Sequence, residues 1–193
     1  TLSYTTLFRS GIVIPMALYN GNYTLSKFPR FIGKRLLRIE PPYLLSVAIM
    51  LGVLYIRKFI PGTVMGTPSF SLQDILLHLG YLIPFVKGAE WIIAVYWTLA
   101  VEFQYYIIIS LLFGFIFSKS IYTRLLIYIL FLFSGFLMPN RAFVITWLPV
   151  FLVGIAYVLQ KSGTIKLSEY ILVTFASFVL ICVDIGIPDR VAS

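Results

Sequence analysis

The sequence predicts an all-α protein, a polytopic transmembrane helical bundle. Hydrophobic residues make up 60% of its 193 residues and charged residues only 11%, whereas a soluble domain has roughly 25% charged residues. The apolar stretches are long and continuous, and they lack the alternation of apolar and polar residues that marks the strands of a membrane barrel. We therefore expect about five full membrane spans, a partial span at the N-terminus and one short interfacial or re-entrant helix.

The apolar runs place these elements in order along the chain. Gly11 to Tyr19 is too short to cross a bilayer and is predicted to be a partial span. A basic connection from Asn20 to Pro42 follows, in which Pro41 and Pro42 are predicted to stop one helix and begin the next. The full spans are expected at Tyr43 to about Ile60, Trp91 to Phe117, Ile121 to Met138, Phe143 to Leu159 and about Tyr170 to Ile187, with the short helix at Leu72 to Phe85.

The start of the chain predicts a fragment of a larger protein. Residues 1–10, TLSYTTLFRS, resemble the translation of a common sequencing adapter and are predicted to be a non-native leader. They do not have the basic start, apolar middle and cleavage site of a secretory signal peptide. Residues 11–193 are then expected to be one partial transmembrane domain that begins in the second half of a helix.

Charge and rare residues exclude several classes of function. The formal net charge is +8, and the basic residues cluster in the predicted loops, which indicates membrane topology and contact with lipid headgroups; no nucleic-acid-binding motif is found. With one cysteine, Cys182, and one histidine, His78, the sequence predicts no intrachain disulfide and no metal site. The excess of Lys and Arg in connection 20–42 and in two later loops predicts that this connection is cytoplasmic.

The most costly residue in the predicted spans is Glu102, near the middle of the run from Trp91 to Phe117. An acidic residue at the centre of a membrane helix costs roughly 2.5–3.5 kcal/mol on insertion scales, so it usually faces the interior of a bundle. Thr98, Tyr105 and Tyr106 lie on or near the same helical face, because they are three or four positions away. Two interpretations stay open, a functional polar site and a polar cluster that joins two helices.

The basic connection contains a second candidate site. Arg35 and Arg38 are three positions apart and point the same way if this segment is helical. Guanidinium groups bind phosphate in a bidentate manner, so the pair could hold a nucleotide, coenzyme A or a lipid headgroup. The alternative is an ordinary cytoplasmic anchor beside anionic lipid.

Two motifs in a fixed order resemble the integral-membrane acyltransferase 3 family. The first is FIGKRLLRIEPPYLL, with the arginine pair ahead of a Pro-Pro segment, and the second is YWTLAVEFQYYIIISLL, similar to the family block W-[ST]-L-x-x-E-x-x-[FY]-Y. The residues that match this block are Trp97, Thr98, Leu99, Glu102, Tyr105 and Tyr106. Phe151 and Gly154, in PVFLVGI, resemble a weaker later pattern, so the resemblance covers roughly residues 11–159.

The resemblance implies an O-acyltransferase with no bound cofactor. Such enzymes transfer an acyl group, usually acetyl, from acyl-CoA to a hydroxyl of a carbohydrate or another cell-envelope molecule, most often at the bacterial inner membrane. Arg35 and Arg38 would bind the coenzyme phosphates, and Glu102 and Tyr106 would be catalytic. Trp97, Thr98 and Tyr105 would support the site or the substrate.

The family also places an essential histidine on a first helix that this sequence does not include. His78 does not match that position, so we expect the chain by itself to be inactive. The alternative function is a transporter or channel fragment, in which Glu102 is a proton or ion site and the arginines bind lipid. A non-catalytic membrane module is the third possibility.

Overall fold

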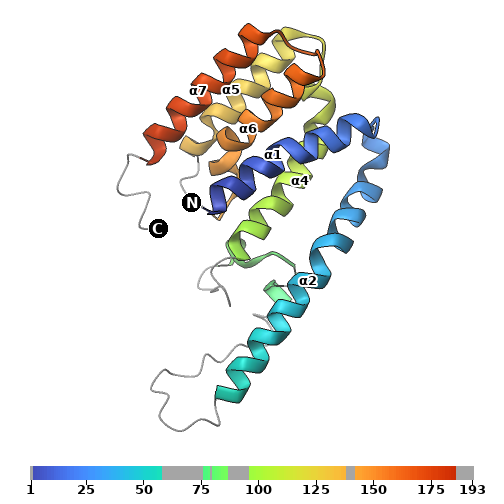
Figure 1. Ribbon diagram of the computed structural model, residues 1–193, viewed down its shortest axis with the longest axis vertical. Coiled ribbons are helices and arrows are strands. Elements are labelled where there is room, and N and C mark those ends of the chain that lie inside the picture. Colours follow the sequence, from blue (N-terminus) through green and yellow to red (C-terminus); the bar gives the residue numbers. More distant parts are fainter. Residues whose placement is uncertain (1, 58–75, 79, 87–95, 138–141, 186–193) are drawn as a thin grey trace. The chain divides into compact units, whose positions relative to one another are not determined.

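The structure, a computed structural model, describes residues 2–57, 76–78, 80–86, 96–137 and 142–185 (Figure 1). Its elements are α1 (Leu2–Asn20), the short 3-10 helix η1 (Leu25–Lys27), α2 (Phe28–Arg57), the 3-10 helix η2 (Ile83–Phe85), α4 (Tyr96–Ile116), α5 (Ile121–Leu137), α6 (Val144–Lys161) and α7 (Leu167–Ile185). The described part of the chain contains no strand, which confirms the predicted all-α helical bundle.

Several of these helices suit a bilayer. Among the described residues, three stretches are long and apolar enough to cross a membrane, namely Leu25–Val53, Tyr96–Ile116 and Val144–Lys161. α5 and α7 are apolar but shorter. The helices are therefore those expected of a membrane protein. The predicted short helix at 72–85 lies partly outside the described residues, and the described part of it comprises three helical residues, a turn and η2.

α2 corrects the predicted helix break at Pro41 and Pro42. The helix continues through both prolines, although each removes an N–H donor and its ring crowds the carbonyl four residues earlier. The carbonyl groups that lose these donors belong to Leu37 and Arg38, whose side chains are exposed. Water or lipid headgroups can therefore pair with them. The predicted connection 20–42 is a turn, η1 and the basic first half of α2.

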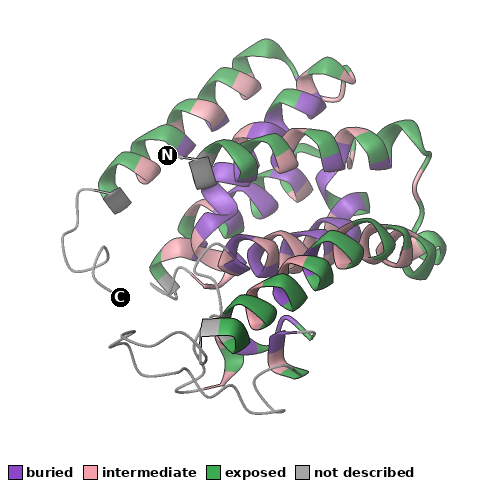
Figure 2. Ribbon diagram, turned by 60° about the horizontal axis from the view of Figure 1, so that its bottom comes forward, coloured by how far each residue is buried: buried purple, intermediate pink, exposed green. Residues whose placement is uncertain are grey.

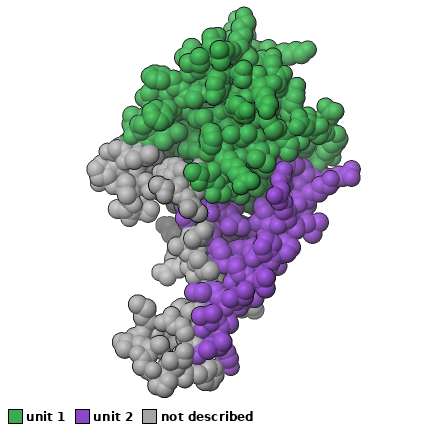
Figure 3. Space-filling model, viewed as in Figure 1, with its two compact units in different colours: residues 1–28, 100–193 green, residues 29–99 purple. Residues whose placement is uncertain are grey.

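The chain divides into two compact units, which Figure 3 shows in different colours. Unit 1 comprises residues 1–28 and 100–193, and unit 2 comprises residues 29–99. Within unit 1, α6 is packed against α1, α5 and α7, and most of its residues are buried. Figure 2 marks buried residues in purple. A long apolar segment that contains Gly154 and Ala156 suits this central place, because small residues let helices approach closely.

α1 includes most of the predicted leader in its helix. It begins at Leu2, and Leu7 is completely buried. At the other end of α1, the ring of Tyr19 stacks on the ring of Phe117 with centroids 5.3 Å apart. Whether residues 1–10 are native is not decided by this packing, and the non-native leader stays a prediction.

One end of unit 1 collects basic residues. The end of α1 shares a surface depression with Lys161, at the end of α6. Lys119, between α4 and α5, lines a pocket together with Lys166, between α6 and α7. Because Tyr19 also stacks on Phe117, the ends of α1, α4 and α6 and the starts of α5 and α7 lie at the same end of this unit.

Candidate functional site

The carboxylate of Glu102 lies on α4 and is directed toward α1. The Ser10 hydroxyl donates a hydrogen bond of 2.6 Å to its Oε1 atom, and the Tyr106 hydroxyl donates one of 3.3 Å to its Oε2 atom. Tyr106 is one helical turn further along α4, so this second contact follows from the helical spacing. Glu102 is half-buried, which matches the predicted inward orientation. The cluster therefore contains one acid and two hydroxyl donors, from two helices.

A close backbone contact between α1 and α6 brings Ser10 into this place. A methyl group added at Gly154 of α6 would lie 2.5 Å from the carbonyl carbon of Gly11 and 2.8 Å from the Ile12 nitrogen. A methyl group at Gly11 would lie 3.0 Å from the carbonyl oxygen of Phe151. Both positions therefore require glycine for this spacing. Ser10 is the residue before Gly11, so the glycine contact fixes the position of Ser10 along the axis of α4.

Tyr105 turns away from Glu102 and toward α6. Its ring stacks on the ring of Phe151, with centroids 3.8 Å apart and planes at 5°, and its side chain is completely buried. Within the described part of the chain, its hydroxyl oxygen is buried without a hydrogen-bond partner. Adjacent residues on a helix point about 100° apart, which explains why Tyr105 and Tyr106 have different neighbours. Phe151, predicted from a weak pattern, is thus the packing partner of a residue in the main motif.

The first turn of α4 belongs to unit 2 and holds a second set of hydroxyl groups. Tyr96 and Ser46 of α2 share a hydrogen bond of 2.6 Å between their hydroxyl oxygens. The Tyr43 hydroxyl donates to the backbone oxygen of His78, and the ring of Tyr43 lies edge-on to Tyr96. His78 is completely buried in this arrangement.

Two further residues of the motif occupy the same turn. Thr98 is buried and Trp97 is half-buried. Thr98 precedes Glu102 by one helical turn on the same helix, so the two residues share a face, as predicted.

The arginine pair lies on the basic first half of α2, in unit 2. The guanidinium carbon of Arg35 is 5.4 Å from the centre of the Phe31 ring, one turn earlier on the helix. Arg38 is exposed and follows within the same helix, so the helical condition behind the prediction is met. The cation–π contact restrains Arg35 before any phosphate is bound. Because this pair belongs to unit 2 and Glu102 to unit 1, the two candidate sites are described separately.

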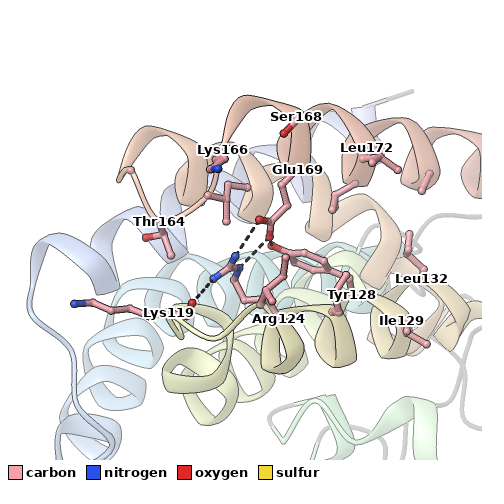
Figure 4. Close-up of a pocket in the computed structure, with 16 residues that line it drawn as sticks. Lys119, Arg124, Tyr128, Ile129, Leu132, Thr164, Lys166, Ser168, Glu169 and Leu172 are labelled. Carbon is pink, nitrogen blue, oxygen red and sulfur yellow. Dashed lines mark hydrogen bonds and ion pairs between the residues drawn. The ribbon is translucent and has the colours of Figure 1, made fainter.

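Unit 1 also contains a buried ion pair that was not predicted from the sequence. Arg124 of α5 and Glu169 of α7 form two hydrogen bonds of 2.9 Å, and the Tyr128 hydroxyl donates a third, of 3.0 Å, to Glu169 (Figure 4). The signal that could have found the cluster is the spacing of Arg124 and Tyr128, one turn apart on a predicted helix, together with an acid at the start of the last helix.

This ion pair has a defined electrostatic effect. Glu169 precedes the predicted span that begins at about Tyr170. Partial burial raises the pKa of the Glu169 carboxyl, but the hydrogen bonds from Arg124 and Tyr128 and the charge of Arg124 outweigh burial. The pKa of Glu169 is therefore below its usual value, and the group carries a charge at neutral pH.

Gln104 has a structural role that the sequence did not indicate. Its Oε1 atom accepts a hydrogen bond of 2.9 Å from the backbone N–H of Val144, and its Nε2 atom donates to the carbonyl of Ala142 at 3.3 Å. The amide thus satisfies one of the backbone donors at the start of α6, where a helix has no partners of its own. It connects α4 to the beginning of α6.

Comparisons of the chain with protein-family models, with curated proteins and with solved structures found no match. The two motifs and the geometry of their residues are therefore the features that indicate a function.

Proposed function

We propose that this chain is part of a membrane O-acyltransferase of the acyltransferase 3 type. The enzyme transfers an acyl group, usually acetyl, from acyl-CoA to a hydroxyl of a carbohydrate or another cell-envelope acceptor. The observation that carries the proposal is the Glu102 carboxylate, held by two hydroxyl groups inside the motif WTLAVEFQYY, on a helix long enough to cross a membrane. An acid in such a helix is by default a functional-site hypothesis.

The role proposed for Glu102 is to orient the acceptor hydroxyl. Its Oε1 atom already accepts a hydrogen bond from the Ser10 hydroxyl, which has the same chemistry as a sugar hydroxyl. Tyr106 donates to the other carboxylate oxygen and fixes the orientation of the carboxylate. A hydroxyl held in one orientation reacts faster, because the rotational and translational entropy has been lost before the reaction.

The reaction replaces a thioester bond by an oxygen ester bond. The acceptor oxygen attacks the thioester carbonyl carbon, the new C–O bond forms, the C–S bond breaks, and coenzyme A leaves with the acceptor's proton on its sulfur. If the essential histidine of the family is the base, Glu102 is left to orient the acceptor, and this is the role that we propose for it. The Tyr105 hydroxyl is buried without a hydrogen-bond partner among the described residues, and a bound substrate or water could satisfy it.

Arg35 and Arg38 are proposed to bind the phosphates of acyl-CoA. Both lie on the exposed or half-exposed basic part of α2, and the Phe31 ring restrains Arg35. A planar guanidinium binds two phosphate oxygens at once, which a lysine cannot do. Trp97 and Thr98 are proposed to support substrate binding at the start of α4.

We further propose a multi-pass protein of the bacterial inner membrane, with connection 20–42 in the cytoplasm. The support is the set of basic residues at one end of unit 1, which includes Lys27 of that connection, Lys119, Lys161 and Lys166. Positive residues accumulate in cytoplasmic loops. Acyl-CoA is a cytoplasmic compound, so this orientation also places Arg35 and Arg38 on the side of the donor.

The test measures the O-acetyl content of surface polysaccharide in cells that express the complete gene product. We expect Glu102→Gln and Arg35→Ala each to reduce acetylation about 100-fold, as expected when orientation of a reactant is lost. Glu40→Gln and Arg30→Ala on α2 are the matched controls, because they change the same charges at residues to which the proposal assigns no role. Normal acetylation in both motif variants, at normal protein levels, would contradict the proposal. Loss of proton-coupled uptake with Glu102→Gln would instead favour the transporter alternative.

A further inference from the structure

A pocket of about 710 Å³ lies between α5 and α7 in unit 1, away from the motif residues (Figure 4). Its lining changes character along the helices. At the loop end it is lined by Lys119, Thr164, Lys166 and the Arg124–Glu169 pair. Further along both helices it is lined by apolar side chains, namely Ile129, Leu132, Leu172, Val173 and Ala176.

The apolar part of this pocket opens to the surroundings of the helices. Leu172 is 70% exposed and Ile129 is 56% exposed, although both side chains are large and apolar. Exposed apolar residues on helices of a membrane protein are in contact with acyl chains, because no water is present at that depth. The pocket is therefore a groove that an acyl chain can enter from the side.

The polar end of the groove carries an excess of positive charge. Arg124 is already occupied, because its N–H groups bind both oxygens of Glu169 and the carbonyls of Ser118 and Lys119. The two lysines that line the pocket add two charges to this neutral pair, and both are exposed. Because the ion pair joins the starts of α5 and α7, the groove between them is formed before any ligand binds.

We propose that this groove binds one anionic phospholipid of the surrounding leaflet. The lipid phosphate lies at the end formed by Lys119 and Lys166, and one acyl chain follows the apolar residues between α5 and α7. Charge complementarity at one end and apolar lining along the remainder match the two parts of a phospholipid. The proposal does not depend on the acyltransferase function, since it uses none of the motif residues.

The test is native mass spectrometry of the protein, purified in detergent and mixed with equal amounts of phosphatidylglycerol and phosphatidylcholine. We expect preferential retention of the anionic lipid by the wild type. The double variant Lys119→Gln/Lys166→Gln is expected to bind the anionic lipid about 25-fold more weakly. Each lysine near a charged lipid surface contributes roughly fivefold to the affinity, and the two contributions multiply. The matched control Lys34→Gln/Lys161→Gln removes the same charge outside the groove and is expected to keep the preference.

A second variant tests the apolar part of the groove. Ala176→Phe introduces a bulky ring between α5 and α7 and is expected to reduce retention of the lipid with both lysines intact. Equal retention of the two lipids by the wild type would overturn the proposal, as would equal loss in the matched control. Displacement of the lipid by inorganic phosphate at equal concentration would also overturn it, because the acyl chain would then add nothing to binding.

Discussion

Two of the carboxylates in unit 1, those of Glu169 and Glu102, are held in different ways. Glu169 receives two hydrogen bonds from the Arg124 guanidinium and one from Tyr128, at the loop end of the bundle. The hydrogen bonds described for Glu102 come from the hydroxyl groups of Ser10 and Tyr106. The first arrangement is an ion pair that joins two helices, α5 and α7. In the second arrangement these two hydrogen bonds come from neutral hydroxyl groups, which can exchange partners at small cost.

This difference separates a structural cluster from a candidate reactive one. Breaking a buried ion pair leaves an uncompensated charge, which costs about 3–5 kcal/mol of stability. A reaction that required Glu169 to leave Arg124 would therefore destabilise the fold. Hydrogen bonds between membrane helices average about 0.6 kcal/mol. A substrate hydroxyl can therefore replace Ser10 at Glu102 with little loss of stability. The following predictions test this comparison, from the largest expected effect to the smallest.

The largest effect is expected from Gly154→Ala. The added methyl group meets backbone atoms of α1 at 2.5 to 2.8 Å, so α1 must move away from α6 and Ser10 from Glu102. We expect a loss of about 3 kcal/mol, the upper end of the range for overpacking, measured as a lower thermal unfolding temperature in detergent. Gly114→Ala on α4 is the control, because a methyl group there meets nothing within 4 Å. Equal effects of the two substitutions would contradict the close contact.

The next effect is expected from Arg124→Met, which leaves the Glu169 carboxylate without its guanidinium partner. Because the side chains of Arg124 and Glu169 are only 6% and 17% exposed, we expect a loss of about 3 kcal/mol in unfolding free energy. The double variant Arg124→Met/Glu169→Met should recover most of this loss, since no unpaired charge remains. A double variant that is as unstable as the single variant would show that the pair is not the source of the effect.

Acid should weaken the Glu169 cluster. The pKa of Glu169 is lower in the folded protein than in the unfolded chain, so its contribution to stability is complete above the unfolded value and is lost as the pH falls through the folded value. We expect the wild type to lose stability below about pH 4.5, measured by thermal unfolding at pH 7 and pH 3. Glu169→Gln should lack this part of the pH dependence. An identical pH dependence in wild type and variant would exclude Glu169 as its source.

The smallest effect on stability is expected from the adjacent tyrosines. Tyr106→Phe removes a hydrogen bond to Glu102 and should cost about 0.6 kcal/mol. Tyr105→Phe removes a buried hydroxyl that has no partner among the described residues, so it should leave the unfolding temperature unchanged or raise it slightly. Thermal unfolding of both variants under identical conditions measures the difference. A larger loss for Tyr105→Phe than for Tyr106→Phe would contradict the orientations seen here.

The sequence predicted the helices well because each apolar run is long and ends at polar residues. The predicted span Ile121 to Met138 is α5 (Ile121–Leu137), and Phe143 to Leu159 corresponds to α6 (Val144–Lys161). The predicted helix break at Pro41 and Pro42 was wrong. Proline favours the end of a helix, but α2 continues through both residues in a part of the helix that is exposed. The direction of Glu102 toward the bundle followed from the cost of a lipid-facing acid.

Contacts between distant helices could not be predicted in the same way. Ser10 belongs to the predicted non-native leader, yet it is one of the two hydroxyl donors described for Glu102. Periodicity places Tyr105 and Tyr106 near one face of α4, but only the packing of α6 shows that Tyr105 stacks on Phe151. Arg124 and Glu169 are 45 positions apart, and a single sequence does not show that the two helices that carry them are neighbours. The acyltransferase function itself remains a proposal from the motifs.

The contact between Gly11 and Gly154 has a consequence for how this protein can evolve. The atoms that would obstruct a side chain at position 154 belong to the main chain of α1. No exchange of a neighbouring side chain can therefore make room, and a harmful substitution at this position has no local suppressor. A second-site revertant would have to shift the whole of α1 along or away from α6, and such a shift would displace Ser10 from the acid that it binds.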